Sequence, residues 1–170
     1  MNMPFRIVLY AGDGTAADTA AAAAFQRIQQ LNDILTDYDA GSELGRLSRT
    51  SGQGRAVPVS EDLWRVLERA QALAERSHGA FDVTVGPLVV LWLEAERAGR
   101  LPSAEALAAA RSRVGPAWVG VDRAASTVEL RLPGAMLDLG GIAKGWTLDR
   151  LAGKLREAGV SRALLAFGQS

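Results

Sequence analysis

The chain has 170 residues, a length typical of one ordinary domain or a large part of one, and enough to bury a substantial core. Its 19 basic residues (Lys and Arg) balance its 19 acidic residues, which argues against a surface that binds nucleic acid. The lack of cysteine excludes disulfides and thiolate metal sites, the single histidine argues against a His-rich metal site, and no apolar run is long enough to predict a membrane-spanning segment.

The first half of the chain alternates strand-like and helical patterns. Ser42 and Ser60 each stand just before a helical segment, where a serine hydroxyl can accept a hydrogen bond from a free backbone N–H, so both are expected to be N-caps. The predicted elements are a strand over 5–11, a helix over 16–35, a polar loop over 37–43, a short helical turn over 44–47, a strand over 56–59 and a helix after residue 60.

Residues 79–92 form an apolar segment that is interrupted by Gly79, Gly86 and Pro87 and carries one charge, Asp82. The glycines and the proline predict an irregular path of the kind that lies under a lid or lines a pocket. A second interpretation stays open, in which the segment is a core loop and Asp82 caps a local turn.

The second half of the chain continues with helices and short strands. Ser103 is expected to cap a helix that runs through Arg113, and Gly159 is expected to end a later helix. The predicted strands are a hairpin over 119–121 and 127–132, an alternating segment over 136–139 and a final strand over 163–167. Because strands and helices do not alternate strictly, the pattern favours an α+β fold with a mixed sheet and packed helices, in a single domain over residues 1–170.

A glycine-rich turn joins the alternating segment to the helix that follows it. Gly140, Gly141 and Gly145 allow the backbone to come close to a ligand. The free N–H groups at a helix start favour an anion and Lys144 adds a positive charge, so the turn predicts a phosphate-bearing ligand. Two alternatives stay open: the turn can be purely structural, and the carboxylate of Asp138 can be paired by Lys144 or by a ligand.

Three segments in this order resemble the FAD:protein FMN transferase family, also called the ApbE family. They are YDAGSEL at 38–44, GAFD with TVGPL and a tryptophan within 79–92, and LDLGGIAKG with a following aspartate within 137–149. The N-terminal MNMPF is also similar to the family's Met-Gly-Thr-x-Phe, with Asn2 and Met3 in place of its usual residues. The resemblance runs along the whole chain and implies a T-fold-like architecture.

The resemblance implies an enzyme that cleaves the pyrophosphate of FAD and passes FMN to a Thr or Ser hydroxyl of a partner flavoprotein, releasing AMP. Such phosphoryl transfer depends mainly on positioning and charge neutralisation, for which Mg²⁺ is implied. Many family members act outside the cytoplasmic membrane, in the periplasm or in association with the membrane. In this chain, Met1 leads directly into a strand-like segment, so no signal peptide is predicted.

Position by position, the resemblance implies FAD contacts in all three segments and at the N-terminus, and it assigns no catalytic residue. The implied FAD contacts are Met1, Tyr38, Ala80, Phe81, Asp82, Asp138 and Lys144. Gly141 matches the position whose backbone carbonyl is a Mg²⁺ ligand, and Mg²⁺ prefers such hard oxygens. Tyr38 matches an aromatic residue that meets the flavin, the alternative being an ordinary surface tyrosine, and Thr84 and Trp92 are assigned to packing.

The chain also departs from the family pattern. Members are longer, and their later half supplies an Asp and a nearby Thr that complete the Mg²⁺ site, whereas no residue here matches them. The strand after the helix usually ends in Gly-Gly-Asp or Gly-Gly-Asn, and here it is followed by Gly168-Gln169-Ser170. The expectation is a fragment that binds Mg²⁺ poorly alone, with its C-terminal portion missing or present as a separate chain. The alternative functions are an FAD-binding carrier or sensor and a scaffold fragment without a ligand.

Overall fold

The computed structural model describes residues 4–168, which divide into two compact units. Residues 4–33 and 142–168 together form one unit, which is therefore built from both ends of the chain, and residues 34–141 form the other. We call them the terminal unit and the central unit. No helix in the described part of the chain combines the length and the apolar character that crossing a membrane requires.

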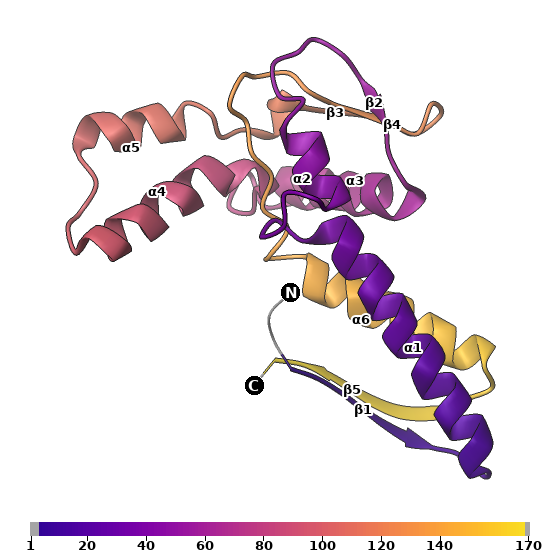
Figure 1. Ribbon diagram of the computed structural model, residues 1–170. Helices are drawn as coiled ribbons and strands as arrows, with labels where there is room; N and C mark the ends of the chain where they lie inside the picture. Colours follow the sequence, from indigo (N-terminus) through magenta and orange to yellow (C-terminus); the bar gives the residue numbers. More distant parts are fainter. Residues whose placement is uncertain (1–3, 169–170) are drawn as a thin grey trace. The chain divides into compact units, whose positions relative to one another are not determined.

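The terminal unit consists of a two-stranded antiparallel sheet with two helices on one side of it (Figure 1). Strand β1 (Phe5–Tyr10) pairs with β5 (Arg162–Phe167) along its whole length. The helices are α1 (Gly14–Leu35), whose last two residues fall in the central unit, and α6 (Ala143–Glu157). Every second residue of β1 packs against the core between sheet and helices, as the alternation of side chains along a strand requires. The core comprises Ala20, Ala24, Leu151, Leu155 and Val160, with Phe5, Ile7, Leu9, Ile28 and Leu165 packed against it.

The ends of the two helices are set by local residues. The carboxylate oxygens of Asp13 accept hydrogen bonds from the N–H groups of Thr15 and Ala16 in the first turn of α1, at 3.1 and 3.3 Å. Helix α6 ends just before Gly159, which has a φ of +79°, a value that glycine adopts at little cost. The predicted role of Gly159 as the stop of this helix is therefore confirmed.

The central unit combines short helices with a small sheet. Its helices are α2 (Glu43–Ser48), α3 (Glu61–Arg76), α4 (Gly86–Ala98) and α5 (Ala104–Arg111), with two 3₁₀ turns, η1 (Val83–Val85) and η2 (Pro116–Trp118). Its antiparallel sheet has the order β2 (Val57–Pro58), β4 (Thr127–Leu130), β3 (Val119–Asp122). Helix α3 supplies much of the buried surface through Leu63, Val66, Leu67 and Ala70. The side-chain amide of Gln71 also donates to the carbonyl of Val119 at 2.6 Å, which ties α3 to the sheet.

Several sequence predictions are confirmed. Ser42, Ser60 and Ser103 cap α2, α3 and α5, each accepting a hydrogen bond from the third backbone N–H of its helix. The predicted hairpin is the β3–β4 pair, in which Val119 lies opposite Leu130. The α+β class is confirmed, although all pairings between the described strands are antiparallel and fall into two sheets, where a mixed sheet was predicted.

Two predictions are wrong. Residues 136–139 do not form a strand: Leu137 and Leu139 are buried and Asp138 is half-buried, but none of the strands within residues 4–168 pairs with this segment. In the segment 79–92, only residues 79–82 are irregular, and the rest is helical, since η1 leads directly into α4. Pro87 lies in the first turn of α4, where the N–H that proline lacks has no intrahelical partner in any case.

Candidate functional site

Asp138 is held in place by its neighbours within the central unit. Its backbone N–H donates to the carbonyl of Val83 at 2.8 Å, which attaches the segment to η1. Its carboxylate oxygen Oδ1 accepts a hydrogen bond from the N–H of Gly140 at 2.7 Å, an arrangement by which aspartate stabilises a tight turn. The side chain is half-buried and is thus partly accessible to a ligand.

Gly141 brings this turn against the aromatic ring of Phe81. A Cβ atom placed on Gly141 would lie 3.0 Å from Cε2 of Phe81, which is closer than ordinary van der Waals contact between carbon atoms. Only glycine leaves the ring in this position without displacement. The contact joins two of the three segments that resemble the transferase family.

The residues around Phe81 are ordered by short hydrogen bonds. The N–H of Phe81 donates to the hydroxyl of Ser77 at 3.0 Å, and the N–H of Ala80 donates to the carbonyl of the same residue at 3.1 Å. Asp82 caps η1 by accepting from the N–H of Thr84 at 2.8 Å, so the interpretation of Asp82 as the cap of a local turn is confirmed. The cap uses only Oδ1 of the Asp82 carboxylate.

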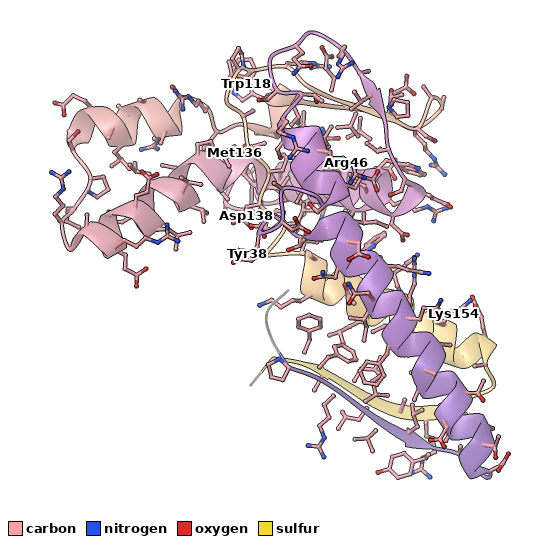
Figure 2. The ribbon with its side chains drawn as sticks, viewed as in Figure 1. Tyr38, Arg46, Trp118, Met136, Asp138 and Lys154 are labelled. Carbon is pink, nitrogen blue, oxygen red and sulfur yellow. The ribbon has the colours of Figure 1, made fainter. Side chains whose placement is uncertain are left out.

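A groove of about 530 Å³ lies between α2, α4 and the segment that carries Asp138. Figure 2 shows Tyr38 beside Asp138, with Met136 further along the same segment as Asp138. The side chain of Tyr38 is 83% exposed, so an aromatic face at the mouth of the groove is open to a flat ligand. Trp92, which was assigned to packing, is 49% exposed on α4 and is not a core residue. The apolar part of the groove wall comprises Leu44, Val89, Val90, Leu93, Met136 and Leu137.

The sequence interpretation missed Asp37, which lines the same groove as Asp138. Partial desolvation of its carboxyl group, and secondly the negative charge of Asp138, raise the pKa of Asp37 above its ordinary value. Two carboxylates that act on one another therefore line the groove together with its apolar residues. No local pattern marks Asp37 in the sequence, because its relation to Asp138 spans a hundred residues of chain.

Two of the predicted FAD contacts are not among the described residues of the central unit. Lys144 is exposed in the first turn of α6 and belongs to the terminal unit, so the proposed pairing between Lys144 and Asp138 stays a prediction. Met1 lies outside the described residues, as do Gln169 and Ser170 of the final segment. Gathered in the central unit are Tyr38, Ala80, Phe81, Asp82, Asp138 and Gly141.

The acidic and histidine side chains of the described residues form no metal-binding cluster. Between residues 4 and 168, no three His, Asp or Glu side chains come close enough together to hold a metal ion. The carbonyl of Gly141 is a hard oxygen in an exposed turn and suits Mg²⁺ as a single ligand, which is well short of the octahedral set that this ion requires.

Comparisons with known proteins agree with the motifs. The ApbE family model matches residues 1–170. The chain is 32% identical over 168 residues to an FAD:protein FMN transferase of Klebsiella pneumoniae, covering 99% of this chain and 52% of that protein. It is 31% identical to an FAD:protein FMN transferase of Haemophilus influenzae, covering 95% of this chain and 49% of the relative.

Solved structures show the same fold. The flavin transferase ApbE of Vibrio cholerae superimposes with a TM-score of 0.88 at 28% identity, covering 99% of this chain and 54% of that one. The ApbE protein of Thermotoga maritima gives a TM-score of 0.84 at 28% identity, covering 98% and 53% respectively. The chain thus spans about half the length of the relatives it matches. By its motifs, its fold and its match along the whole sequence, the chain belongs to the ApbE family.

Proposed function

We propose that this chain is the flavin-binding part of an FAD:protein FMN transferase. The observation that supports this proposal is the meeting of all three motif segments around Asp138. Its N–H is bonded to Val83 of the second segment, and Gly141, three residues on, lies against Phe81. Asp138 also lines one groove with Tyr38 of the first segment.

In the proposed reaction, the hydroxyl oxygen of a Thr or Ser on the acceptor flavoprotein attacks the phosphorus atom of the FMN half of FAD. A new phosphoester bond forms while the bond from that phosphorus to the bridging oxygen breaks, so AMP leaves with the bridging oxygen and the hydroxyl proton passes to solvent. The chain's own part is to bind and orient FAD. Tyr38 offers a face on which the flavin can stack, and Phe81, Asp82 and Asp138 provide an aromatic edge and hydrogen-bond acceptors.

Mg²⁺ belongs to this proposal through the carbonyl of Gly141. When bound, the ion would neutralise negative charge on the diphosphate of FAD. The described residues form no group of three His, Asp or Glu side chains that could supply the other ligands, so we propose that the active protein needs groups beyond this chain to hold the metal.

The test is flavinylation of an acceptor by the full-length protein. Incubation with FAD, Mg²⁺ and an acceptor domain should give a fluorescent acceptor whose mass has increased by FMN, together with one AMP for each FMN transferred. An acceptor in which the target Thr is replaced by Ala should stay unlabelled. The Asp138→Ala variant should lose labelling, whereas Asp18→Ala, which removes an exposed carboxylate on α1, should keep it.

The same assay separates the alternatives. Bound FAD with neither AMP nor labelled acceptor would refute transfer and leave an FAD-binding carrier or sensor. Release of AMP and FMN without labelling would indicate FAD hydrolysis, with water in place of the acceptor hydroxyl. If the protein does not bind FAD at all, the remaining alternative is a scaffold without a ligand.

A further inference from the structure

The hydroxyl of Thr84 has a fixed direction in the central unit. Thr84 is completely buried, and its Oγ1 lies 2.7 Å from the backbone N of Gly115 and 2.7 Å from Oδ1 of Asp82. The N–H of Gly115 can only donate, so Oγ1 accepts there. The single hydrogen of the hydroxyl is therefore left for the carboxylate of Asp82.

The carboxylate of Asp82 is consequently occupied on one side. Oδ1 accepts two hydrogen bonds, from Oγ1 of Thr84 at 2.7 Å and from the N–H of the same residue at 2.8 Å. Within residues 4–168, no hydrogen bond reaches Oδ2, although the side chain is half-buried. Two hydrogen bonds to Oδ1 fix the orientation of the carboxylate group, while Oδ2 can still accept hydrogen bonds from other donors.

Thr84 also ties this arrangement to a distant part of the chain. Gly115 directly precedes η2 and is separated from Thr84 by 31 residues, so the hydroxyl bridges two segments that are far apart in the sequence. One of the two partners of this hydroxyl, Asp82, is a residue that is implied to contact FAD.

We infer that Thr84 is a positioning residue, which orients Asp82 so that Oδ2 accepts a hydrogen bond from a donor group of the bound nucleotide. This inference rests on the proposed function, since it takes Asp82 as an FAD contact. Because a carboxylate repels phosphate oxygens, the group that it recognises is a neutral donor: a ribityl or ribose hydroxyl, the flavin N–H or the adenine amino group. Binding of FMN and of AMP, measured separately, tells the flavin half from the adenosine half.

The central experiment compares Thr84→Val with Thr84→Ser in the full-length protein, with FAD affinity measured by titration calorimetry. Valine keeps the volume but removes the hydroxyl, and FAD should bind about tenfold more weakly, the usual effect of losing one hydrogen bond to a charged group. Serine keeps the hydroxyl and should bind within about twofold of the wild type. Thr147→Val is the matched control, because Thr147 is also completely buried but its Oγ1 has no hydrogen-bond partner among the described residues.

A double-mutant cycle shows whether Thr84 acts through Asp82. In an Asp82→Ala background, Thr84→Val should cause no further loss of FAD affinity, although it still lowers the melting temperature by leaving the N–H of Gly115 without a partner. An equal loss of FAD affinity in both backgrounds would overturn the inference, as would wild-type affinity of a folded Thr84→Val protein.

Asp82→Asn gives an answer even if the valine variant does not fold. The amide can keep both bonds on its oxygen, so the melting temperature should stay near that of the wild type, but an NH₂ group replaces Oδ2 and FAD should bind more weakly. Unchanged FAD affinity of this variant would show that Oδ2 does not meet the nucleotide and would overturn the inference. A wild-type protein that fails to bind FAD would instead refute the proposed function.

Discussion

Replacement of Gly86 by alanine should destabilise the central unit, because Gly86 lies directly against the segment that carries Asp138. A Cβ atom on Gly86 would come within 2.7 Å of both Cβ and the carbonyl oxygen of Met136. The ordinary contact distance between carbon atoms is about 3.5 Å, so α4 and the segment that carries Met136 and Asp138 would have to move apart by about 1 Å. The added Cβ would contact the backbone and the Cβ atom of Met136, and rotation of the Met136 side chain cannot move these atoms away.

Such overpacking typically costs about 1–3 kcal/mol, of which a better helix propensity for alanine can return at most about 1 kcal/mol. We expect Gly86→Ala to lower the melting temperature by several degrees, measured by circular dichroism. The control is Gly153→Ala in α6, where nothing lies within 4 Å of the added Cβ, so the melting temperature should rise. A Gly86→Ala protein as stable as the wild type would refute the close approach of α4 to this segment.

Three further predictions concern the same region. The pKa of Asp37 is raised, first by partial desolvation and then by the charge of Asp138, so ionisation of this carboxyl group lowers the stability of the fold as the pH rises. The Asp37→Asn variant should therefore have a higher melting temperature than the wild type at pH 7, and this difference should vanish below the ordinary pKa of 3.8. A difference that does not change with pH would contradict this. Gly141→Ala should push the ring of Phe81 aside and weaken FAD binding about tenfold in a fluorescence titration, so an unchanged affinity would speak against a ligand at this turn. Ser42→Ala removes a buried hydroxyl that accepts a hydrogen bond from an N–H of α2 at 2.8 Å and donates one to a backbone carbonyl at 2.6 Å. It should lower the free energy of unfolding, measured by urea denaturation, by about 1–2 kcal/mol. A smaller loss than that caused by Ser103→Ala, which removes the exposed cap of α5, would contradict this.

Local signals in the sequence predicted local structure well. A serine before a helical pattern caps a backbone N–H three positions on, and a glycine after one ends the helix through its own backbone conformation. Ser42, Ser60 and Gly159 accordingly have the predicted roles. The prediction failed for residues 136–139, because alternating burial shows only that one side of a segment is covered. A strand also needs a neighbouring strand, and this segment lies against a 3₁₀ turn.

The motifs predicted most of the residues of the candidate site, but not which of them lie in contact. Tyr38, Phe81 and Asp138 were each identified from their own segment, but the contact of Phe81 with Gly141 depends on long-range packing that no spacing encodes. The hydrogen bond between Thr84 and Gly115 was missed for the same reason, and Thr84 was assigned to packing. Its two partners are visible only once the chain has folded.

The pairing of β1 with β5 has a consequence for the order of folding. These strands are separated by more than 150 residues of chain, so their ladder closes a very long loop and contributes a high contact order. The central unit, by contrast, is contiguous and is synthesised in full before α6 and β5. We expect the central unit to fold first during synthesis. Until α6 and β5 have been made, β1 and α1 would keep their apolar faces exposed, and this is the stage at which a chaperone would engage the nascent chain.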